Sequence, residues 1–117
     1  MMNEEVQPLI KVAESCPVTI YIAGDYDKAI KSTKEYCDET GYCVTVTPTV
    51  YVHTGGLPDG VIVGLINYPR FPQTPDTILE RALVIAKKLR VDLEQESFSI
   101  ETPDNTIWYS YRKEDIA

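Results

Sequence analysis

The sequence has few of the residues that metal sites and catalytic triads require. It contains one histidine, His53, and three cysteines, Cys16, Cys37 and Cys43, which share no CxxC spacing. One histidine argues against a histidine-rich metal site or a Ser-His-Asp triad. An odd number of unevenly spaced cysteines argues against a zinc site or a disulfide framework. We therefore expect no bound metal, packed and reduced cysteines, and a structural or solvent-facing His53.

The sequence also lacks the short motifs that build phosphate and dinucleotide sites. Neither G-x-x-x-x-G-K-[ST] nor G-x-G-x-x-G occurs. Carboxylates such as Asp25, Asp76 and Asp104 stand at predicted helix starts and turns, where capping accounts for them. No pair of carboxylates is placed for acid–base work. The residues therefore predict a protein that is not an enzyme and needs no cofactor.

The sequence has few positively charged residues. Eleven Lys and Arg stand against eighteen Asp and Glu, which gives a net charge of −7. Such a chain is a poor general binder of DNA or RNA, although two or three local cations can still hold a small phosphate-bearing ligand. No apolar run approaches the roughly 20 residues of a membrane span, and residues 1–5 are unlike a signal peptide. We therefore expect a cytoplasmic protein with no membrane contact.

The pattern of apolar residues predicts one α+β domain over residues 1–117. Strands are expected at 18–23, 42–53, 61–66, 97–101 and 106–112, with helices at 26–39 and from 75 onward. The order β-α-β-β-α-β-β predicts a five-stranded, mainly antiparallel sheet with two helices, all within 17–113. Pro48 requires the second strand to lie at an edge or to be bulged. Residues 1–16 are predicted to be either an arm or a short helix.

Two features of the predicted elements bear on partners and burial. Residues 61–66 contain no polar side chain, which is typical of a strand covered on both faces. The second helix, which begins after Thr74, has an apolar surface wider than one sheet requires. This surface is either buried between the sheet and the first helix or partly turned toward a partner subunit.

Two groups of cationic and aromatic residues are the best candidates for ligand binding. One group follows the third strand in a proline-rich loop: Asn67, Tyr68, Arg70 and Phe71. The other group lies in the last strand: Trp108, Tyr109, Tyr111 and Arg112. Rings can stack on a base, and guanidinium groups can pair with phosphate, so these groups suit a small nucleotide. The alternative is that Tyr109 and Tyr111 are core residues and Arg112 forms a surface ion pair.

Three segments resemble the phage-encoded Thoeris anti-defence 1 family: YIAGD at 21–25, CVTVTPT at 43–49 and GVIVGLINYPRFP at 60–72. The likeness would cover residues 18–112. It implies a sponge that captures a cyclic ADP-ribose isomer made by bacterial TIR-domain immune proteins. The ligand would be sequestered without cleavage, so that Thoeris immunity is blocked.

The resemblance also implies partners and site residues. It implies a homo-oligomer built from dimers, up to a hexamer, with pockets between subunits and a separate site for cyclic oligonucleotides. The ligand-binding residues it implies are Asn67, Arg70 and Phe71, and more weakly Trp108, Tyr109 and Arg112. Two rival hypotheses remain: a small nucleotide hydrolase that uses His53 with a carboxylate, and an obligate-oligomer interaction module.

Overall fold

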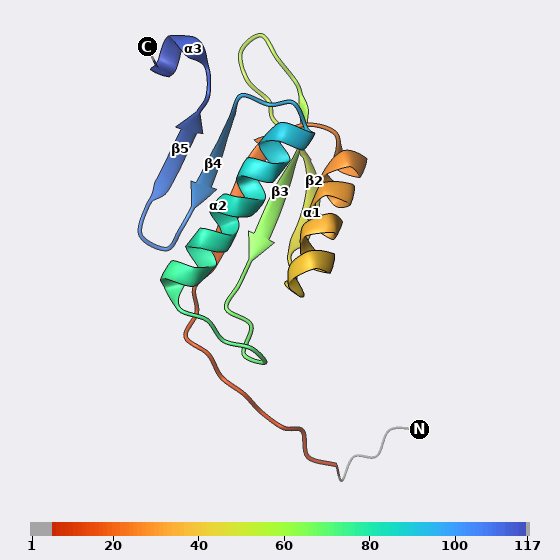
Figure 1. Cartoon of the computed structure of the whole chain (residues 1–117), viewed down its shortest axis with the longest axis vertical. Helices are drawn as coiled ribbons and strands as arrows, with labels where there is room; N and C mark the ends of the chain where they lie inside the picture. The colour runs from red at the N-terminus through yellow and green to blue at the C-terminus, as the bar shows by residue number, and fades with distance from the viewer. Residues whose placement is uncertain (1–5, 117) are drawn as a thin grey trace.

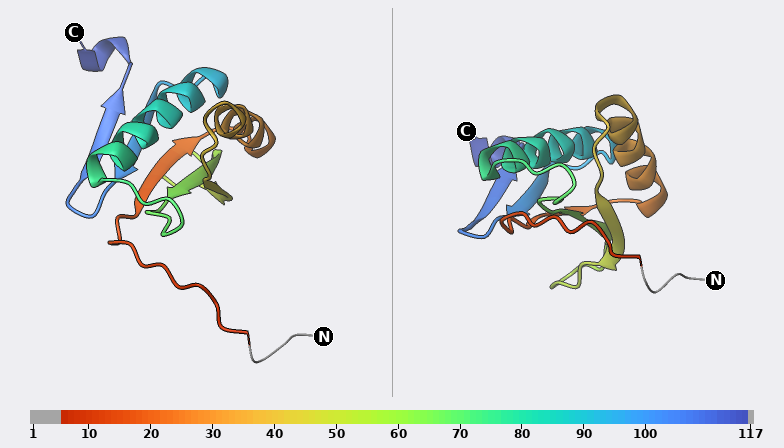
Figure 2. Two further views of the ribbon diagram at one scale, coloured as in Figure 1. Left: turned by 60° about the horizontal axis from the view of Figure 1, so that its bottom comes forward. Right: turned by 90° about the horizontal axis from the view of Figure 1, so that it is seen from below.

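A computed structural model describes residues 6–116 as one antiparallel sheet with two long helices on one of its faces (Figures 1 and 2). The strands lie in the order β2-β3-β1-β4-β5. The elements are β1 (Val18–Ala23), α1 (Tyr26–Thr40), β2 (Thr45–Val50), β3 (Asp59–Leu65), α2 (Pro75–Asp92), β4 (Ser97–Glu101), β5 (Thr106–Ser110) and the short α3 (Lys113–Ile116). The predicted α+β fold and element order are confirmed. The short α3 lies where only a charged tail was expected.

The ends of both long helices follow from their capping residues. The Asp25 side chain accepts a hydrogen bond from the backbone N–H of Lys28 at 3.0 Å, and Gly41 ends α1 with a positive φ of 72°. Thr74 caps α2 in the same way, with Pro75 as its first residue. Among residues 6–116, no helix is long and apolar enough to cross a membrane.

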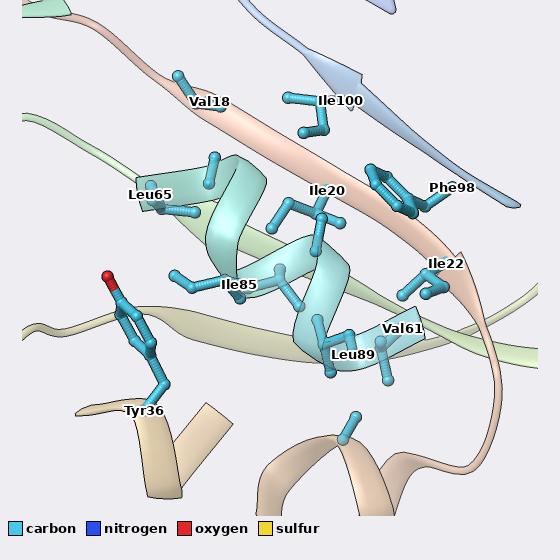
Figure 3. Packing of buried hydrophobic residues seen from close by; sticks show 14 of the residues in the cluster. Val18, Ile20, Ile22, Tyr36, Val61, Leu65, Ile85, Leu89, Phe98 and Ile100 are labelled. Carbon is cyan, nitrogen blue, oxygen red and sulfur yellow. The ribbon is translucent and has the colours of Figure 1, made fainter. Parts of the chain in front are cut away.

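The core lies between the helices and one face of the sheet (Figure 3). Val18, Ile20 and Ile22 of β1 point toward Ile85 and Leu89 of α2, and each of the five is at most 2% exposed. Matching residues come from β3 and β4, namely Val61, Val63, Leu65, Phe98 and Ile100. Burial of one such side chain contributes about 1.5–3 kcal/mol, so these ten residues together are a large favourable term in folding.

The opposite face of the sheet, here called the bare face, has no described element over it (Figure 2). Burial in β3 alternates after Val61, with Ile62 and Gly64 only half-buried. The prediction that this strand is covered on both faces was therefore wrong. The run reads as continuously apolar because its two bare-face positions hold an isoleucine and a glycine in place of polar residues.

Strand β2 lies at an edge of the sheet, as Pro48 requires. Odd-numbered residues of β2 hydrogen-bond toward β3, a pattern continued by Tyr51, whose N–H donates to the Pro58 carbonyl at 2.9 Å. Pro48 therefore faces outward, where its missing N–H costs no ladder bond. The strand is shorter than the predicted 42–53, because the chain turns at a bridge between His53 and Gly56.

Residues 6–16 form an extended N-terminal arm that leaves the body below the sheet (Figure 1). With the arm, the described chain measures 61 × 31 × 29 Å. Val6, Leu9, Ile10 and Val12 are between 66% and 89% exposed, whereas Cys16 at the root is buried. The four exposed aliphatic side chains of the arm are therefore not covered by any other part of the described chain.

Candidate functional site

The bare face carries a hollow of about 390 Å³ near the end of β1. Its floor consists of small residues of β1 and β4, among them Ala23, Ser97 and Ser99. Larger groups surround it: Tyr21, Tyr51, His53, Trp108 and Arg112. This sheet-face hollow has a volume within the range of small-molecule sites, and its open floor can receive a flat ring.

Tyr51 is fixed at the wall of the sheet-face hollow. Its hydroxyl donates to the Val61 carbonyl at 2.8 Å, and its ring lies over Gly60. A Cβ at Gly60 would meet that ring at 2.1 Å, so the glycine makes room for the tyrosine. Burial raises the pKa of the Tyr51 hydroxyl. The ring is therefore a rigid, neutral surface.

Tyr21 and Trp108 provide two further aromatic groups. The Tyr21 hydroxyl donates to the Glu101 carboxylate at 2.8 Å, and this hydrogen bond raises the Tyr21 pKa. Trp108 pairs with Ser99 in the β5–β4 register and leaves 55% of its surface exposed. A large exposed indole above a floor of serines offers a stacking surface.

Arg112 supplies the positive charge. Its Nε lies 3.5 Å from a carboxylate oxygen of Glu96, and the two side chains are 42% and 70% exposed. An ion pair this exposed contributes little, so the guanidinium can exchange Glu96 for a ligand anion. The predicted surface ion pair thus exists, and the same side chain lines the hollow.

His53 is part of a tight turn at the rim. Its Nδ1 lies 3.1 Å from the Thr54 carbonyl, and its ring packs over Gly56. No carboxylate in residues 6–116 hydrogen-bonds to His53, and no three His, Cys, Asp or Glu side chains in that range gather as a metal site. The arrangement favours a wall residue over a general base.

The proline loop, residues 67–74, forms a second group. Phe71 packs against Tyr68 with ring centroids 5.4 Å apart and is 43% exposed, and Arg70 is also exposed. The pKa of Tyr68 is raised to about 12, mainly by burial and secondly by a hydrogen bond with the Cys43 thiol. Both ends of the Asn67 amide are used: it donates to the Glu14 carbonyl and accepts from the Gln73 N–H, each at 2.9 Å.

The structure does not bring all the predicted site residues together within one chain. β1 and β3 are antiparallel. Ala23 pairs with Gly60 at the end of the sheet that carries the hollow, and Val18 pairs with Leu65 at the opposite end. The proline loop follows Leu65, so Arg70 and Phe71 lie at the far end of the sheet from Arg112 (Figure 1). Tyr109 lies on the helix-covered face, where its ring stacks on Phe98 at 4.9 Å.

Two tyrosines that line the hollow, Tyr21 and Tyr51, were not among the sequence candidates. Tyr21 alternates with the buried residues of β1, so it lies on the opposite face of the sheet. An expectation that this face is uncovered would have made Tyr21 a candidate. Tyr51 continues the register of β2 and shares the bare face with the other odd-numbered residues of that strand. The period of two along β2 would therefore have pointed to Tyr51 as well.

No protein-family model matches the chain, and no curated protein matches it. Two solved structures have the same fold. One is a phage SAM lyase in the apo state, with a TM-score of 0.67 and 16% identity over 88% of this chain and 96% of that one. The other is a phage SAM lyase in complex with S-methyl-5′-thioadenosine, with a TM-score of 0.68 and 13% identity over 90% and 96%. At such identities the likeness extends to the fold alone.

Proposed function

We propose that this chain is a phage anti-defence protein that binds a cyclic ADP-ribose isomer and sequesters it intact. The observation that carries the proposal is the exposed Trp108 beside Arg112 over a floor of small residues. The sequence resemblance to Thoeris anti-defence 1 proteins supplies the ligand class. The second group, in the proline loop, supplies further candidates for contact.

The adenine ring stacks on Trp108, with the fixed Tyr51 and Tyr21 as neighbouring walls. Stacking of a base on an aromatic side chain contributes about 1–3 kcal/mol. The Arg112 guanidinium leaves Glu96 and pairs with a phosphate, because planar donors match phosphate oxygens in a bidentate way. The rigid rings lose little conformational freedom on binding, which favours the tight binding that sequestration requires.

The site is completed by a second copy of the chain. A pyrophosphate carries two negative charges, whereas each sheet-face hollow has one arginine. Arg70 and Phe71, at the far end of the sheet, reach a hollow only from a neighbouring subunit. This arrangement also accounts for an oligomer with pockets between its chains. A separate site for cyclic oligonucleotides belongs to the same proposal.

Binding without cleavage follows from the groups around the hollow. Two carboxylates contact its lining residues, and both are engaged: Glu96 by Arg112 and Glu101 by Tyr21. His53 contacts a backbone carbonyl. The hollow therefore offers rings, hydroxyls and a guanidinium, but no base aligned on a nucleophile.

A second candidate function is a lyase that releases S-methyl-5′-thioadenosine from S-adenosylmethionine. The shared fold with a phage SAM lyase favours it. Its ligand contains the same adenosine group that a cyclic ADP-ribose isomer contains, so one stacking surface suits both. The two functions differ in whether a bond of the ligand is broken.

One experiment separates the candidates. Purified protein is incubated with each cyclic ADP-ribose isomer and, separately, with S-adenosylmethionine, and chromatography then quantifies every species after denaturation. A sponge releases one intact cyclic ADP-ribose isomer in proportion to protein and leaves S-adenosylmethionine unchanged. A lyase accumulates S-methyl-5′-thioadenosine far beyond the amount of protein. A hydrolase converts the cyclic nucleotide, and an interaction module retains neither compound.

A further inference from the structure

We infer that the N-terminal arm of one copy pairs with the free edge of β5 in a second copy, adding a sixth, antiparallel strand beside the ligand hollow. The two surfaces concerned are the arm, with its exposed aliphatic residues, and the unpaired edge of the sheet. This inference stands apart from the identity of the ligand.

The edge of β5 is a complete row of unused backbone groups. Odd-numbered residues of β5 hydrogen-bond to β4, a pattern that Tyr111 continues by donating to the Glu96 carbonyl at 2.7 Å. Thr106, Trp108 and Ser110 therefore direct their N–H and C=O groups outward, where no strand of the described chain lies. The other edge, β2, is interrupted by the outward-facing Pro48. An open, proline-free edge is a ready template for another strand.

The arm has the sequence of a strand with one usable edge. Its even-numbered positions are apolar: Val6, Pro8, Ile10 and Val12. Pro8 has no N–H, so the edge formed by even-numbered residues has a gap. The odd-numbered edge, formed by Gln7, Leu9, Lys11 and Ala13, retains every donor. The arm must therefore dock through its odd-numbered residues.

Antiparallel pairing is the arrangement that also matches the side chains. In an antiparallel ladder, residues that exchange hydrogen bonds lie opposite each other and share a face. Odd-numbered arm residues would then share the bare face with Trp108. The even-numbered apolar row would lie on the other face, over the half-exposed Ile107 and Tyr109. Parallel pairing reverses the faces and leaves Val6, Ile10 and Val12, three of the four exposed aliphatic side chains of the arm, on the bare face. Antiparallel pairing leaves only Leu9 there.

The arm cannot make this contact with its own chain. Its root is held beside β1 by the hydrogen bond from Asn67 to the Glu14 carbonyl, and β4 lies between β1 and β5. From that root the arm runs away from β5 (Figures 1 and 2). Fully extended, residues 6–13 span about 26 Å, enough to cover the roughly 17 Å of β5. A second copy supplies the same edge and receives the same arm.

The exchange has a consequence for the ligand site. Lys11 is an odd-numbered residue, so it lies on the bare face of the partner's sheet, in the row next to Trp108. Each sheet-face hollow thereby gains a cation from the neighbouring chain.

The test compares Lys11→Pro with Val12→Pro in the full chain. Lys11→Pro removes a donor from the docking edge, whereas Val12→Pro removes an N–H that points away and keeps an apolar ring. Sedimentation equilibrium should show an oligomer for the wild type, with its dissociation constant raised at least tenfold by Lys11→Pro and less than threefold by Val12→Pro. Both variants should keep the wild-type circular dichroism.

Hydrogen exchange read by NMR reports the docking edge directly. The amides of Thr106, Trp108 and Ser110 should be protected in the wild type, in a concentration-dependent way, and should exchange rapidly in Lys11→Pro. A monomeric wild type, equal effects of the two prolines, or protection that does not depend on concentration would each overturn the inference. So would an oligomer in which these three amides exchange at unprotected rates.

Discussion

The side chain of Asn67 donates a hydrogen bond to the backbone carbonyl of Glu14 at 2.9 Å, which joins residues 53 positions apart. The same amide accepts from the Gln73 N–H. One side chain thus fixes the root of the arm and the shape of the proline loop. Asn67 was predicted as a ligand-reading residue, and any such contact would compete with these two bonds.

Substitution of Asn67 should separate its two contacts. Asn67→Ala removes both bonds and should lower the free energy of unfolding by about 1–3 kcal/mol, measured by urea denaturation. Asn67→Asp keeps an acceptor for the Gln73 N–H but loses the donor to Glu14. The Gln73 amide should therefore stay protected from exchange in the aspartate variant alone. Unchanged stability in both variants would contradict this role.

Two glycines of β3 provide a matched pair. In Gly60→Ala the new Cβ would lie 2.1 Å from the Tyr51 ring and 2.8 Å from the Ile22 carbonyl, so Tyr51 must leave the hollow wall. In Gly64→Ala the nearest atom is the Thr45 hydroxyl, which can rotate away. We expect Gly60→Ala to cost about 1–3 kcal/mol of stability and to weaken ligand binding, with Gly64→Ala much milder in both. Thermal unfolding and calorimetry would measure these effects, and equal behaviour would contradict the placement of Tyr51.

Asp92 should make stability depend on acid pH. The Asp92 carboxylate accepts hydrogen bonds from Lys88 at 2.8 Å and from Ser32 at 2.6 Å. The bond from Lys88 has the larger effect, and together the two hold the pKa of Asp92 below its ordinary value. Its contribution is therefore present above about pH 3.9 and is lost as the pH falls through the lower, folded-state pKa. We expect Asp92→Asn to reduce the unfolding free energy at pH 7, with the difference from wild type vanishing in that acid range.

The control for Asp92 is Asp38→Asn, which removes an exposed partner of Lys34. Exposed pairs of this kind contribute little, so this variant should leave the free energy of unfolding unchanged within error at any pH. A pH-independent loss in Asp92→Asn would show that packing, not charge, is responsible.

Ligand affinity should depend on both groups of predicted residues. Phe71→Ala and Arg112→Ala should each weaken binding of the cyclic ADP-ribose isomer well over tenfold while the fold survives, and Trp108→Ala should cost about 1–3 kcal/mol of binding free energy. Tyr109→Phe preserves the ring that stacks on Phe98 and should leave affinity unchanged. Calorimetry measures all four, and unchanged affinity in Phe71→Ala and Arg112→Ala together would remove the proposed pocket.

The local features of this fold could be predicted because they depend on near neighbours in sequence. Asp25, Gly41 and Thr74 mark helix ends through contacts within four residues. The period of two along β5 is enough to place Trp108 and Tyr109 on opposite faces, as the structure has them. Pro48 limited its strand to an edge or a bulge, since it lacks a donor for the ladder, and the strand lies at an edge.

The remaining features depend on contacts between distant segments. The strand order places Tyr21 beside Glu101, 80 residues away, and no local pattern encodes such a neighbour. The hydrogen bond from Asn67 to Glu14 could be predicted only by knowing where the arm leaves the sheet. The bare face was missed because Ile62 and Gly64 carry no polar mark of exposure.

We propose that a cyclic ADP-ribose isomer is bound by this protein and released unaltered. The direct measurement is to incubate the protein with an excess of that isomer, remove free ligand, denature the protein, and identify by mass spectrometry what was bound. We expect the intact isomer in a fixed ratio to protein, and far less of it from the Arg112→Ala variant. Recovery of a linear or cleaved product, or of no nucleotide at all, would contradict it.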